Sequence, residues 1–530
     1  RLLRDERGKS YVILNPGSSR VRFGLGSQTE PLEEAHCIAY RRPEGAPAPA
    51  SPCLPVTNDP ERERAASQVE ELLRVPNGRA GGRSGGEPPP APAALQRWDD
   101  MDMEGAFEAA GEGGAWAWRV YGRDALRLPP GAPYEVRWPV RAGRLRVSPQ
   151  HPLHAARDEL RDLWQWLMEE RLELNAKARS RCHVVLIASS WLDNRDVREM
   201  VDCLLSDLGF QAALVHREAT ATSVARGIYT ACVVNVGAQS CTVSCVEDGM
   251  EIAGTRQLLP YGSEHVGRTL QWLLARAGLW PLPDFDCDAP HDMRSLDPFK
   301  EAVCWFRDEQ GEAEGAPGTQ PPRPEAYALE SPRAGGVFTF PVNNSGRVSA
   351  FGLFVPSLFV VPSAPYEKEP RLRLTECDLA MEMPETTEKP YEASRAKKGE
   401  LLGLHEAVVA SIRGARGEMR KRLFANIILS GGGADTRGIA SALEEYVLAK
   451  IPYSEDTETV EVLADDAERA PADLPWHGGV TLALMDSSRD CWIQRTEWVE
   501  GVFVKVPRRL TSTTSPNVSL LWYLGAENAP

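Results

Sequence analysis

The order of helical and strand-like apolar patterns predicts the fold class. Apolar side chains recur at helical spacing between residues 160 and 172, and again between residues 197 and 208. Between these segments, the uninterrupted apolar run HVVLIA at 183–188 predicts a buried strand. Helix, strand, helix is typical of an α/β sheet covered by helices.

One strand–turn–strand pattern occurs twice. YVILNPGSSRVRFGLG at 11–26 and ACVVNVGAQSCTVSCVEDG at 231–249 each contain a strand, an Asn-x-Gly triplet, a small polar turn and an alternating strand. The pattern predicts a duplicated fold. Backbone N–H groups in such turns can converge on an anion; a single turn of this kind is more typical of an ordinary hairpin, and it is the second, matched copy that favours an anion site. LSGGGADTRG at 429–438, after a strand predicted at 424–429 and before a helix, would complete a nucleotide site.

Stretches rich in proline or glycine interrupt this pattern. They cover residues 43–60, 76–92, 312–336 and, with charges of both signs, 362–399. Proline removes a backbone donor and fixes φ, so these stretches are not expected to hold helices or central strands. They are interpreted as loops inserted into the fold.

Composition narrows the function classes. The 530 residues include 60 Lys and Arg against 75 Asp and Glu, for a net charge of −15, so DNA contact would need a local basic patch. The stretch 395–422 is such a candidate, and the alternative is a solvated helix face carrying Arg413, Arg416 and Arg420. The 11 cysteines form no CxxC pair, which argues against zinc. No membrane-length apolar run or signal-peptide core occurs, so a soluble intracellular protein is expected.

Four longer segments resemble actin. They are GLHEAVVASIRGARGEMRKRLFANIILSGGG at 403–433, WHGGVTLALMDSSRDCWIQRTEWVEGV at 476–502, LLPYGSEHVGRTLQWLLARAGL at 258–279 and LFVPSLF at 353–359. On these segments the chain is identified as a member of the actin superfamily. The resemblance implies an α/β, actin-like fold, a duplicated ribonuclease-H-like design with two lobes of four subdomains around a nucleotide cleft. The expected subdomains are 10–42 with 116–225 and 474–530 (one), 43–115 (two, a Pro/Gly-rich insertion), 226–261 with 400–473 (three), and 262–399 (four, with insertions at about 308–336 and 362–399).

Shorter motifs resemble the actin-related protein 8 family of the INO-eighty chromatin remodeller. They are the Asn-Pro-Gly-Ser opening, CVEDG at 245–249, the Tyr-Gly-Ser turn at 261–263, WPVRAGRL at 138–145 and the insertion after LFVPSLF. This resemblance implies a nuclear scaffold subunit with roles in transcription regulation and DNA repair. Its implied partners are a helicase-SANT-associated helix, nuclear actin, another actin-related protein, and the DNA and histones of the nucleosome, with no membrane.

The resemblance also implies altered nucleotide chemistry. Asn15, Asn235 and Ala238 stand where actin has aspartates that hold the water shell of magnesium, and Arg22 replaces a phosphate-binding lysine. Glu218 stands where a glutamine orients the attacking water; it is interpreted as repelling phosphate rather than acting as a base, with a plain helix-surface acid as the alternative. ATP with weak or no magnesium, and no competent hydrolysis, are therefore expected, with no catalytic residue and no metal site.

The purine side keeps more of the actin pattern. Lys300 and Glu301 match a Lys-Glu pair that embraces the adenosine, whereas Asp435, Thr436 and Ala472 depart from the actin pocket. The expected nucleotide-binding residues are Ser18, Ser19, Arg22, Gly237, Gln239, Lys300, Glu301, Gly431, Gly432 and Gly433.

Partner binding has its own candidates. Trp492, Ile493 and Trp498 lie in the segment that lines the helix-docking groove of actin, and the alternative is that they pack within their own domain. Two other classes share the fold. Sugar kinases and Hsp70-type enzymes would need the missing hairpin acids, and filament-forming actins would need a short loop where the 43–115 insertion stands.

Overall fold

The fold is described from a computed structural model. It describes residues 8–43, 59–73, 96–97, 118–129, 131–148, 151–192, 194–282, 285–287, 289–306, 326–331, 336–361, 394–395, 400–451, 459–463, 469–485 and 491–499.

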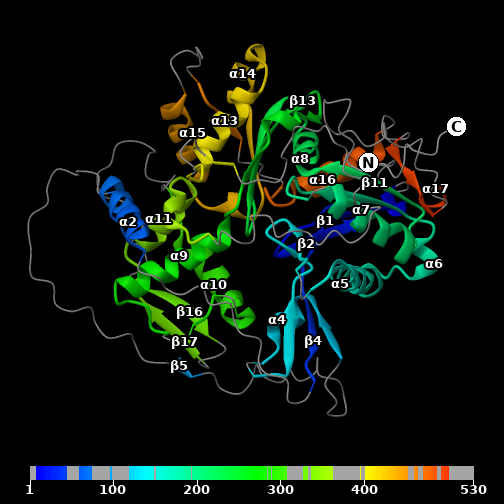
Figure 1. Cartoon of the computed structure of the whole chain (residues 1–530), viewed down its shortest axis with the longest axis horizontal. Coiled ribbons are helices and arrows are strands. Elements are labelled where there is room, and N and C mark those ends of the chain that lie inside the picture. The colour runs from blue at the N-terminus through cyan, green and yellow to red at the C-terminus, as the bar shows by residue number, and fades with distance from the viewer. Residues whose placement is uncertain are drawn as a thin grey trace, which may run out of the picture.

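Two sheets of the same topology form the centres of two lobes (Figure 1). In each sheet an antiparallel hairpin is followed by two further strands that run parallel to its first strand. The duplicated, actin-like fold expected from the sequence is confirmed. In the first lobe the order is β20 (Ile493–Gln494), β11 (Ala212–Arg217), β10 (His183–Ala188), β1 (Tyr11–Pro16), β2 (Arg20–Leu25) and β3 (Leu32–Ala35). In the second it is β14 (Met250–Glu251), β13 (Cys241–Glu247), β12 (Ala231–Val236), β18 (Ile427–Ser430) and β19 (Val462–Leu463), with β15 (Gln257–Leu259) also paired to β13.

Helices cover both sheets because each turns an apolar stripe toward them. Leu160, Leu163 and Trp164 are buried in the first core, which confirms the predicted helix, and HVVLIA is strand β10. The main helices are α5 (Leu153–Trp166), α7 (Asn194–Asp202), α8 (Glu218–Arg226), α9 (Ser263–Arg276), α10 (Pro290–Val303), α13 (Leu404–Gly414), α14 (Gly417–Phe424), α15 (Ile439–Lys450) and α16 (Leu474–Leu484). Shorter ones are α4 (Gly122–Arg127), α6 (Ala176–Arg179), α11 (Ser345–Ala350) and α17 (Arg495–Val499), with π-helical turns at Leu167–Arg171 and Cys203–Asp207.

Smaller sheets extend each lobe. β4 (Ile38–Arg41) lies between β6 (Arg119–Tyr121) and β7 (Tyr134–Arg137) below the first lobe, followed by the hairpin of β8 (Val140–Arg141) and β9 (Arg144–Leu145). In the second lobe β17 (Gly336–Phe340) lies between β16 (Tyr327–Ser331) and β5 (Gln96–Arg97).

Two predicted boundaries were wrong. The strand expected at 424–429 begins at Ile427, because Phe424 still belongs to α14 and is buried as its last residue. The loop expected over 312–336 contains strand β16, whose alternating pattern buries Leu329 against the second core. The proline-rich stretches at 44–58, 76–92 and 362–393 lie outside the described residues.

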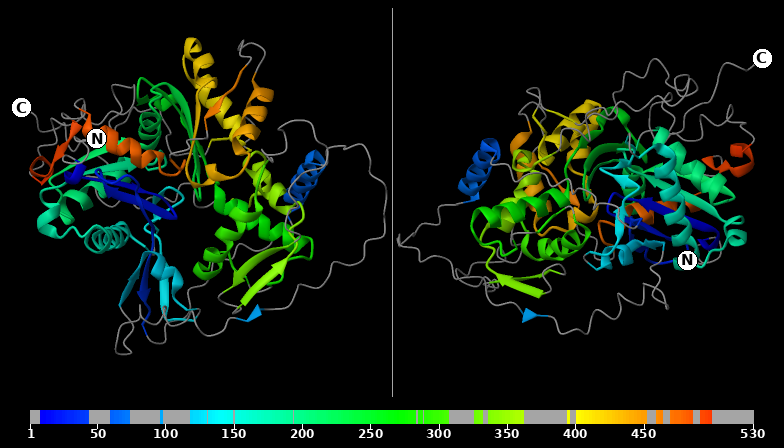
Figure 2. Two further views of the ribbon diagram at one scale, coloured as in Figure 1. Left: turned by 180° about the vertical axis from the view of Figure 1, so that it is seen from behind. Right: turned by 60° about the horizontal axis from the view of Figure 1, so that its bottom comes forward.

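The expected insertion 43–115 contributes a helix that packs on the second lobe. In α2 (Pro60–Leu73), Ala65, Ala66 and Val69 are buried in the second core, and the helix lies beside α9 and α11 (Figures 1 and 2). Arg276 of α9 pairs with Glu63 at 2.9 Å and with Glu70 at 3.0 Å.

A buried arginine fixes this helix. The Nε of Arg62 donates to the Leu358 carbonyl at 2.8 Å, and Nη2 donates to Thr269 Oγ1 at 3.2 Å. The guanidinium carbon lies 4.0 Å from the centre of the Trp272 ring. Burial lowers the pKa of Arg62 to about 10. The helix is therefore docked by a charge as well as by apolar contact.

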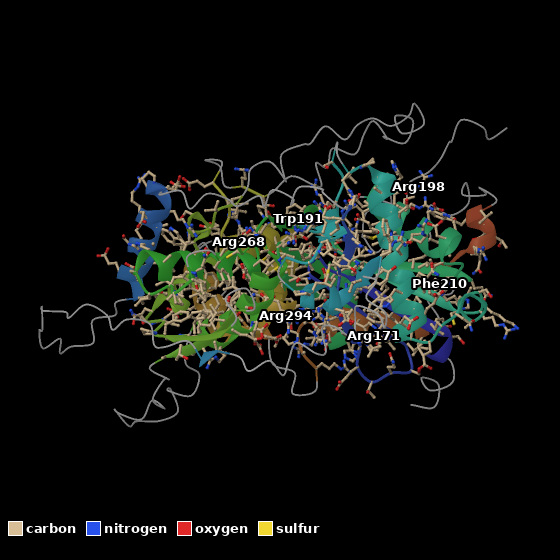
Figure 3. The ribbon with its side chains drawn as sticks, turned by 90° about the horizontal axis from the view of Figure 1, so that it is seen from below. Arg171, Trp191, Arg198, Phe210, Arg268 and Arg294 are labelled. Carbon is tan, nitrogen blue, oxygen red and sulfur yellow. The ribbon has the colours of Figure 1, made fainter. Side chains whose placement is uncertain are left out.

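The two lobes also contact each other directly. Figure 3 shows side chains between them, with Trp191 of the first lobe and Arg268 of α9 labelled. The indole of Trp191 donates to the Cys241 carbonyl at 3.3 Å, and Ser190 Oγ donates to Glu251 at 3.0 Å. All four of these hydrogen-bonding groups are buried, so the bonds hold the lobes in one arrangement.

Candidate functional site

The two hairpins turn toward each other at the junction of the lobes. Gly17 N donates to Arg20 O at 3.0 Å, and Gly237 N donates to Ser240 O at 3.1 Å, so both turns are closed in the same way. Asn15 faces Arg22 across the first hairpin, as Asn235 faces Thr242 across the second. The predicted repeat therefore forms a symmetric pair of turns.

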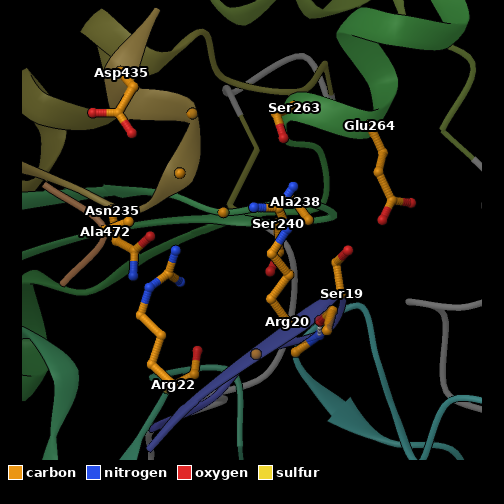
Figure 4. A pocket seen from close by; sticks show the side chains of 18 of the residues that line it. Ser19, Arg20, Arg22, Asn235, Ala238, Ser240, Ser263, Glu264, Asp435 and Ala472 are labelled. Atoms are coloured by element: carbon orange, nitrogen blue, oxygen red, sulfur yellow. Dashed lines mark hydrogen bonds between the residues drawn. The ribbon is translucent and has the colours of Figure 1, made fainter. Parts of the chain in front are cut away.

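Between the hairpins lies a cleft of about 540 Å³ (Figure 4). Arg20 and Arg22 enter it from the first hairpin, and Asp435 lies across it on the second lobe. Nearly all the predicted residues line this cleft. They are Asn15, Ser18, Ser19, Arg22, Glu218, Asn235, Gly237, Ala238, Lys300, Glu301, Gly431, Gly432 and Gly433.

Gln239 lies behind the cleft wall. Its Oε1 accepts from Ala142 N at 2.6 Å and its Nε2 donates to Glu264 at 2.9 Å. On the other hairpin, Ser18 Oγ accepts from Gly143 N at 2.8 Å. The β8–β9 turn thus holds both hairpins, and Gln239 is a positioning residue rather than a cleft-lining one.

Arg22 is engaged by two carboxylates. Its Nε lies 2.7 Å from Asp473 Oδ1, and its Nη2 lies 2.5 Å from Glu33 Oε2. Glu33 also pairs with Arg20 at 2.8 Å. The cation expected to reach phosphate therefore already neutralises acids within the cleft.

The purine side is built from α10 and the glycine turn after β18. Lys300 Nζ pairs with Asp297 at 2.7 Å on the same helix, one turn away. Gly431 has φ +86°, and a side chain there would collide with Asn235 and Val236. Only glycine fits this close approach of the glycine turn to the second hairpin. Asp435 and Thr436 follow in the same wall.

Glu218 begins α8 at the floor of the cleft. Burial raises its pKa from 4.5 to about 7, although hydrogen bonds from Asn235 and Asn15 and the charge of Arg22 lower it. Asn15 also donates to the Ile187 carbonyl at 3.3 Å. The two hairpins therefore place neutral amides, and no carboxylate of their own, beside Glu218, which is a poor arrangement for a cation.

Acidic groups outnumber basic ones in the cleft. Among the described lining residues three are basic: Arg20, Arg22 and Lys300. Seven are acidic: Glu33, Glu218, Glu264, Asp297, Glu301, Asp435 and Asp473. Burial raises the pKa of Asp473 and of Asp435, while Arg22 lowers both.

Sequence reasoning missed the acids that hold Arg22. Glu33 lies directly opposite Arg22 in the β2–β3 register, so a hairpin alignment of these strands contained the signal. Asp473 approaches from 451 residues away, and no local pattern indicates that contact.

The three predicted groove residues are buried in their own lobe. Trp492 stacks on Tyr11 with ring centres 5.6 Å apart, and Ile493 is fully buried on the β11 edge. Trp498 donates its indole N–H to Asp202 at 2.7 Å. Their apolar surface packs the C-terminal segment onto the first sheet, so the alternative of packing within their own domain is correct.

A separate groove of about 270 Å³ lies along α16. One helical row of that helix lines it, with Arg469 at its edge: His477, Val480, Thr481, Leu484 and Met485. Thr481 and Met485 are exposed, and His477 and Val480 form the buried floor. In the basic stretch Arg413, Arg416, Lys421 and Arg422 are exposed, although Arg416 pairs with Glu247 and Arg420 donates to the carbonyls of Ala415 and Arg413.

The family model for actin matches residues 152–509. The chain belongs to the actin family. Actin-related protein 9 of Oryza sativa subsp. japonica is 31% identical over 96% of this chain and 95% of that protein. Actin-related protein 8 of Aedes aegypti is 25% identical over 93% and 95%. The expected likeness to actin-related protein 8 is therefore shared with actin-related protein 9, which matches at higher identity.

A solved structure supports the fold. That structure, human actin-related protein Arp8 in its ATP-bound state, has a TM-score of 0.75 and 23% identity, covering 95% of this chain and 96% of the other.

Within the described residues, no helix is long and apolar enough to cross a membrane. The same residues contain no group of three acidic, His or Cys side chains placed to hold a metal ion.

Proposed function

We propose that this actin-related protein is a nuclear scaffold subunit of a chromatin-remodelling complex that does not form filaments. Its partners would be a helicase-SANT-associated helix of the remodelling ATPase, nuclear actin and another actin-related protein. Through the complex it would help to engage nucleosomal DNA and histones. The family likeness to actin-related proteins 8 and 9 supports this class, and an INO-eighty-type complex is the specific proposal.

The α16 groove is the observation that carries the proposal. Val480 and His477 are buried in it, Leu484 is half-buried, and Thr481 and Met485 are exposed, so a helix with an apolar face could pack along this row. Arg469 at its edge suits an acidic residue beside the apolar face of the incoming helix. A few large side chains from that helix, each contributing about 2 kcal/mol, would supply most of the affinity.

The cleft would bind ATP without hydrolysing it. The predicted residues line one cavity of about 540 Å³, and one relative of the same fold has been solved with ATP. The hairpin positions 15, 235 and 238 carry no carboxylate to anchor magnesium, so turnover is not part of the proposed function.

Complex formation with the isolated helix tests the scaffold role. Size-exclusion chromatography with light scattering is expected to show a one-to-one complex without nucleotide. Thr481→Arg should fill the groove and weaken binding about thirtyfold, equivalent to 2 kcal/mol. Gln68→Arg, exposed on α2 of the other lobe, is the matched control. If the chain does not bind the helix and instead sediments as filaments after salt is added, the scaffold proposal is refuted and a cytoskeletal role is favoured.

Affinity purification from nuclear extract tests the complex. An INO-eighty-type ATPase and nuclear actin are expected to co-purify with the tagged chain. Recovery of a different remodelling ATPase would reject the specific complex while leaving the scaffold role intact.

A further inference from the structure

Every basic side chain that lines the described cleft is already paired with an acid of the same cleft. Arg22 holds Asp473 and Glu33, and Arg20 shares Glu33. Lys300 holds Asp297 at 2.7 Å. A phosphate chain that enters must therefore compete with carboxylates for these donors, and it adds negative charge where acids already predominate.

A divalent cation is poorly suited to relieve this excess. At the floor, one carboxyl group, Glu218, lies beside the amides of Asn15 and Asn235, and both amides lower its pKa. Magnesium is anchored best by anionic oxygens that hold its water shell, whereas positions 15 and 235 carry neutral amides. Neutralisation must come from another source.

We propose that a nucleotide binds here by displacing the carboxylates from Arg22, and that the cleft takes up protons on its own carboxyl groups in place of recruiting a divalent cation. This inference rests on the proposed nucleotide binding and names how that binding is regulated. Asp473, Asp435 and Glu218 are the proton-accepting groups.

The surroundings of these groups support proton uptake. Arg22 lowers the pKa of both Asp473 and Asp435, so its transfer to phosphate removes that effect from each. Glu218 faces Asn15 of β1, Arg22 of β2, Asn235 of β12 and Glu251 of β14, and its pKa is already about 7. An incoming phosphate would raise the pKa of all three carboxyl groups further, because like charges favour the neutral form.

Calorimetry of the full chain with ATP measures the linkage. Titrations in buffers of different ionisation enthalpy, between pH 6 and 8 and with or without EDTA, give the number of protons taken up. The terminal phosphate of ATP titrates in the same range, so the wild type is compared with the double variant E218Q/D473N. The difference between them is the uptake by the chain's own carboxyl groups.

The expected results are specific. The wild type should take up about one proton more than the double variant at pH 7, and its affinity should fall by up to tenfold per pH unit above 7. At pH 8 the double variant should bind ATP at least tenfold more tightly, and EDTA should change neither affinity. Asp158→Asn, an exposed residue of α5 outside the cleft, is the control and should behave as the wild type.

Three outcomes would overturn the inference. They are loss of ATP binding on addition of EDTA, equal proton uptake by the wild type and the double variant, or no ATP binding even at pH 6. None of these outcomes would contradict the proposed scaffold role, because binding of the helix is proposed at α16 and is measured without nucleotide.

Discussion

Replacing Glu218 by glutamine should stabilise the protein, and only above the pH at which a free glutamate ionises. The side chain starts α8 beneath both hairpins, where the amides of Asn15 and Asn235 lower its pKa. Glutamine keeps its length, and a turn of the Asn235 amide lets its oxygen accept from the new side chain. The substitution therefore removes the ionisable group with little change of shape.

The pKa of Glu218 sets the magnitude. Burial raises it from 4.5 to about 7, so the folded state binds a proton that the unfolded state releases between these pH values. Stability from this group is complete below pH 4.5 and is lost as the pH rises through 7. The whole difference between the unfolded and folded pKa values corresponds to about 3 kcal/mol of unfolding free energy, at about 1.4 kcal/mol per pKa unit. Because part of the side chain faces the open cleft, we expect about 2–3 kcal/mol for Glu218→Gln at pH 8.

Thermal unfolding at pH 5 and pH 8 tests this reasoning. At pH 8 the melting temperature of the variant should be about 5–10 °C above that of the wild type. This range follows from about 2–4 °C per kcal/mol for a lobe of roughly 200 residues. At pH 5 the two melting temperatures should nearly coincide. Asp158→Asn on α5 controls for loss of a surface charge. An equal difference at both pH values would show that shape, not ionisation, is responsible.

Three further predictions concern activity and packing. Steady-state phosphate release at saturating Mg-ATP should be far slower than that of filamentous actin; comparable turnover that Glu218→Gln abolishes would contradict the absence of catalysis. Arg62→Ala should lower unfolding free energy by about 2–4 kcal/mol in urea titration, whereas exposed Arg64→Ala should be near neutral. Trp498→Phe should cost about 1–2 kcal/mol by losing the bond to Asp202, and an unchanged urea midpoint would contradict that role.

The core of the fold could be predicted because its signals are local. Each hairpin contains its own strand periodicity and its turn glycine, and HVVLIA defines a buried strand without reference to other segments. Helix α2 could not be placed in this way. PERERAASQVEELL is highly charged, and its docking depends on Leu358 and Thr269, which lie 296 and 207 residues away from Arg62.

The sequence predicted which residues line the cleft, but it did not predict how their charges are paired. Residue types at the two hairpins indicated which side chains would line it. Whether Arg22 would be available to phosphate depends on Asp473, which joins the cleft only because α16 begins there. Such a contact between distant segments leaves no periodic pattern in the sequence.

The three aromatic and aliphatic residues that the sequence suggested for a partner groove are buried within their own lobe. The β20 strand pairs with β11, and that pairing buries the apolar area of Trp492 and Ile493 inside the first lobe. The α16 groove instead lies along a largely buried, apolar helix, where Thr481 and the following Met485 are exposed. The sequence signal for this groove was the spacing of His477, Thr481 and Leu484, which places them on one face of a helix.

The hairpin amides limit the negative charge at the floor of the cleft. Carboxylates at positions 15 and 235 would place two more negative charges beside Glu218, with Arg22 already shared between two acids. Neutral amides at these positions avoid that repulsion, and Asn15 donates to the Ile187 carbonyl. The contacts between the lobes through Trp191 and Ser190 are hydrogen bonds made within the chain itself. A lobe arrangement fixed by the chain's own bonds gives α16 a constant shape, which a scaffold requires whether or not nucleotide is present.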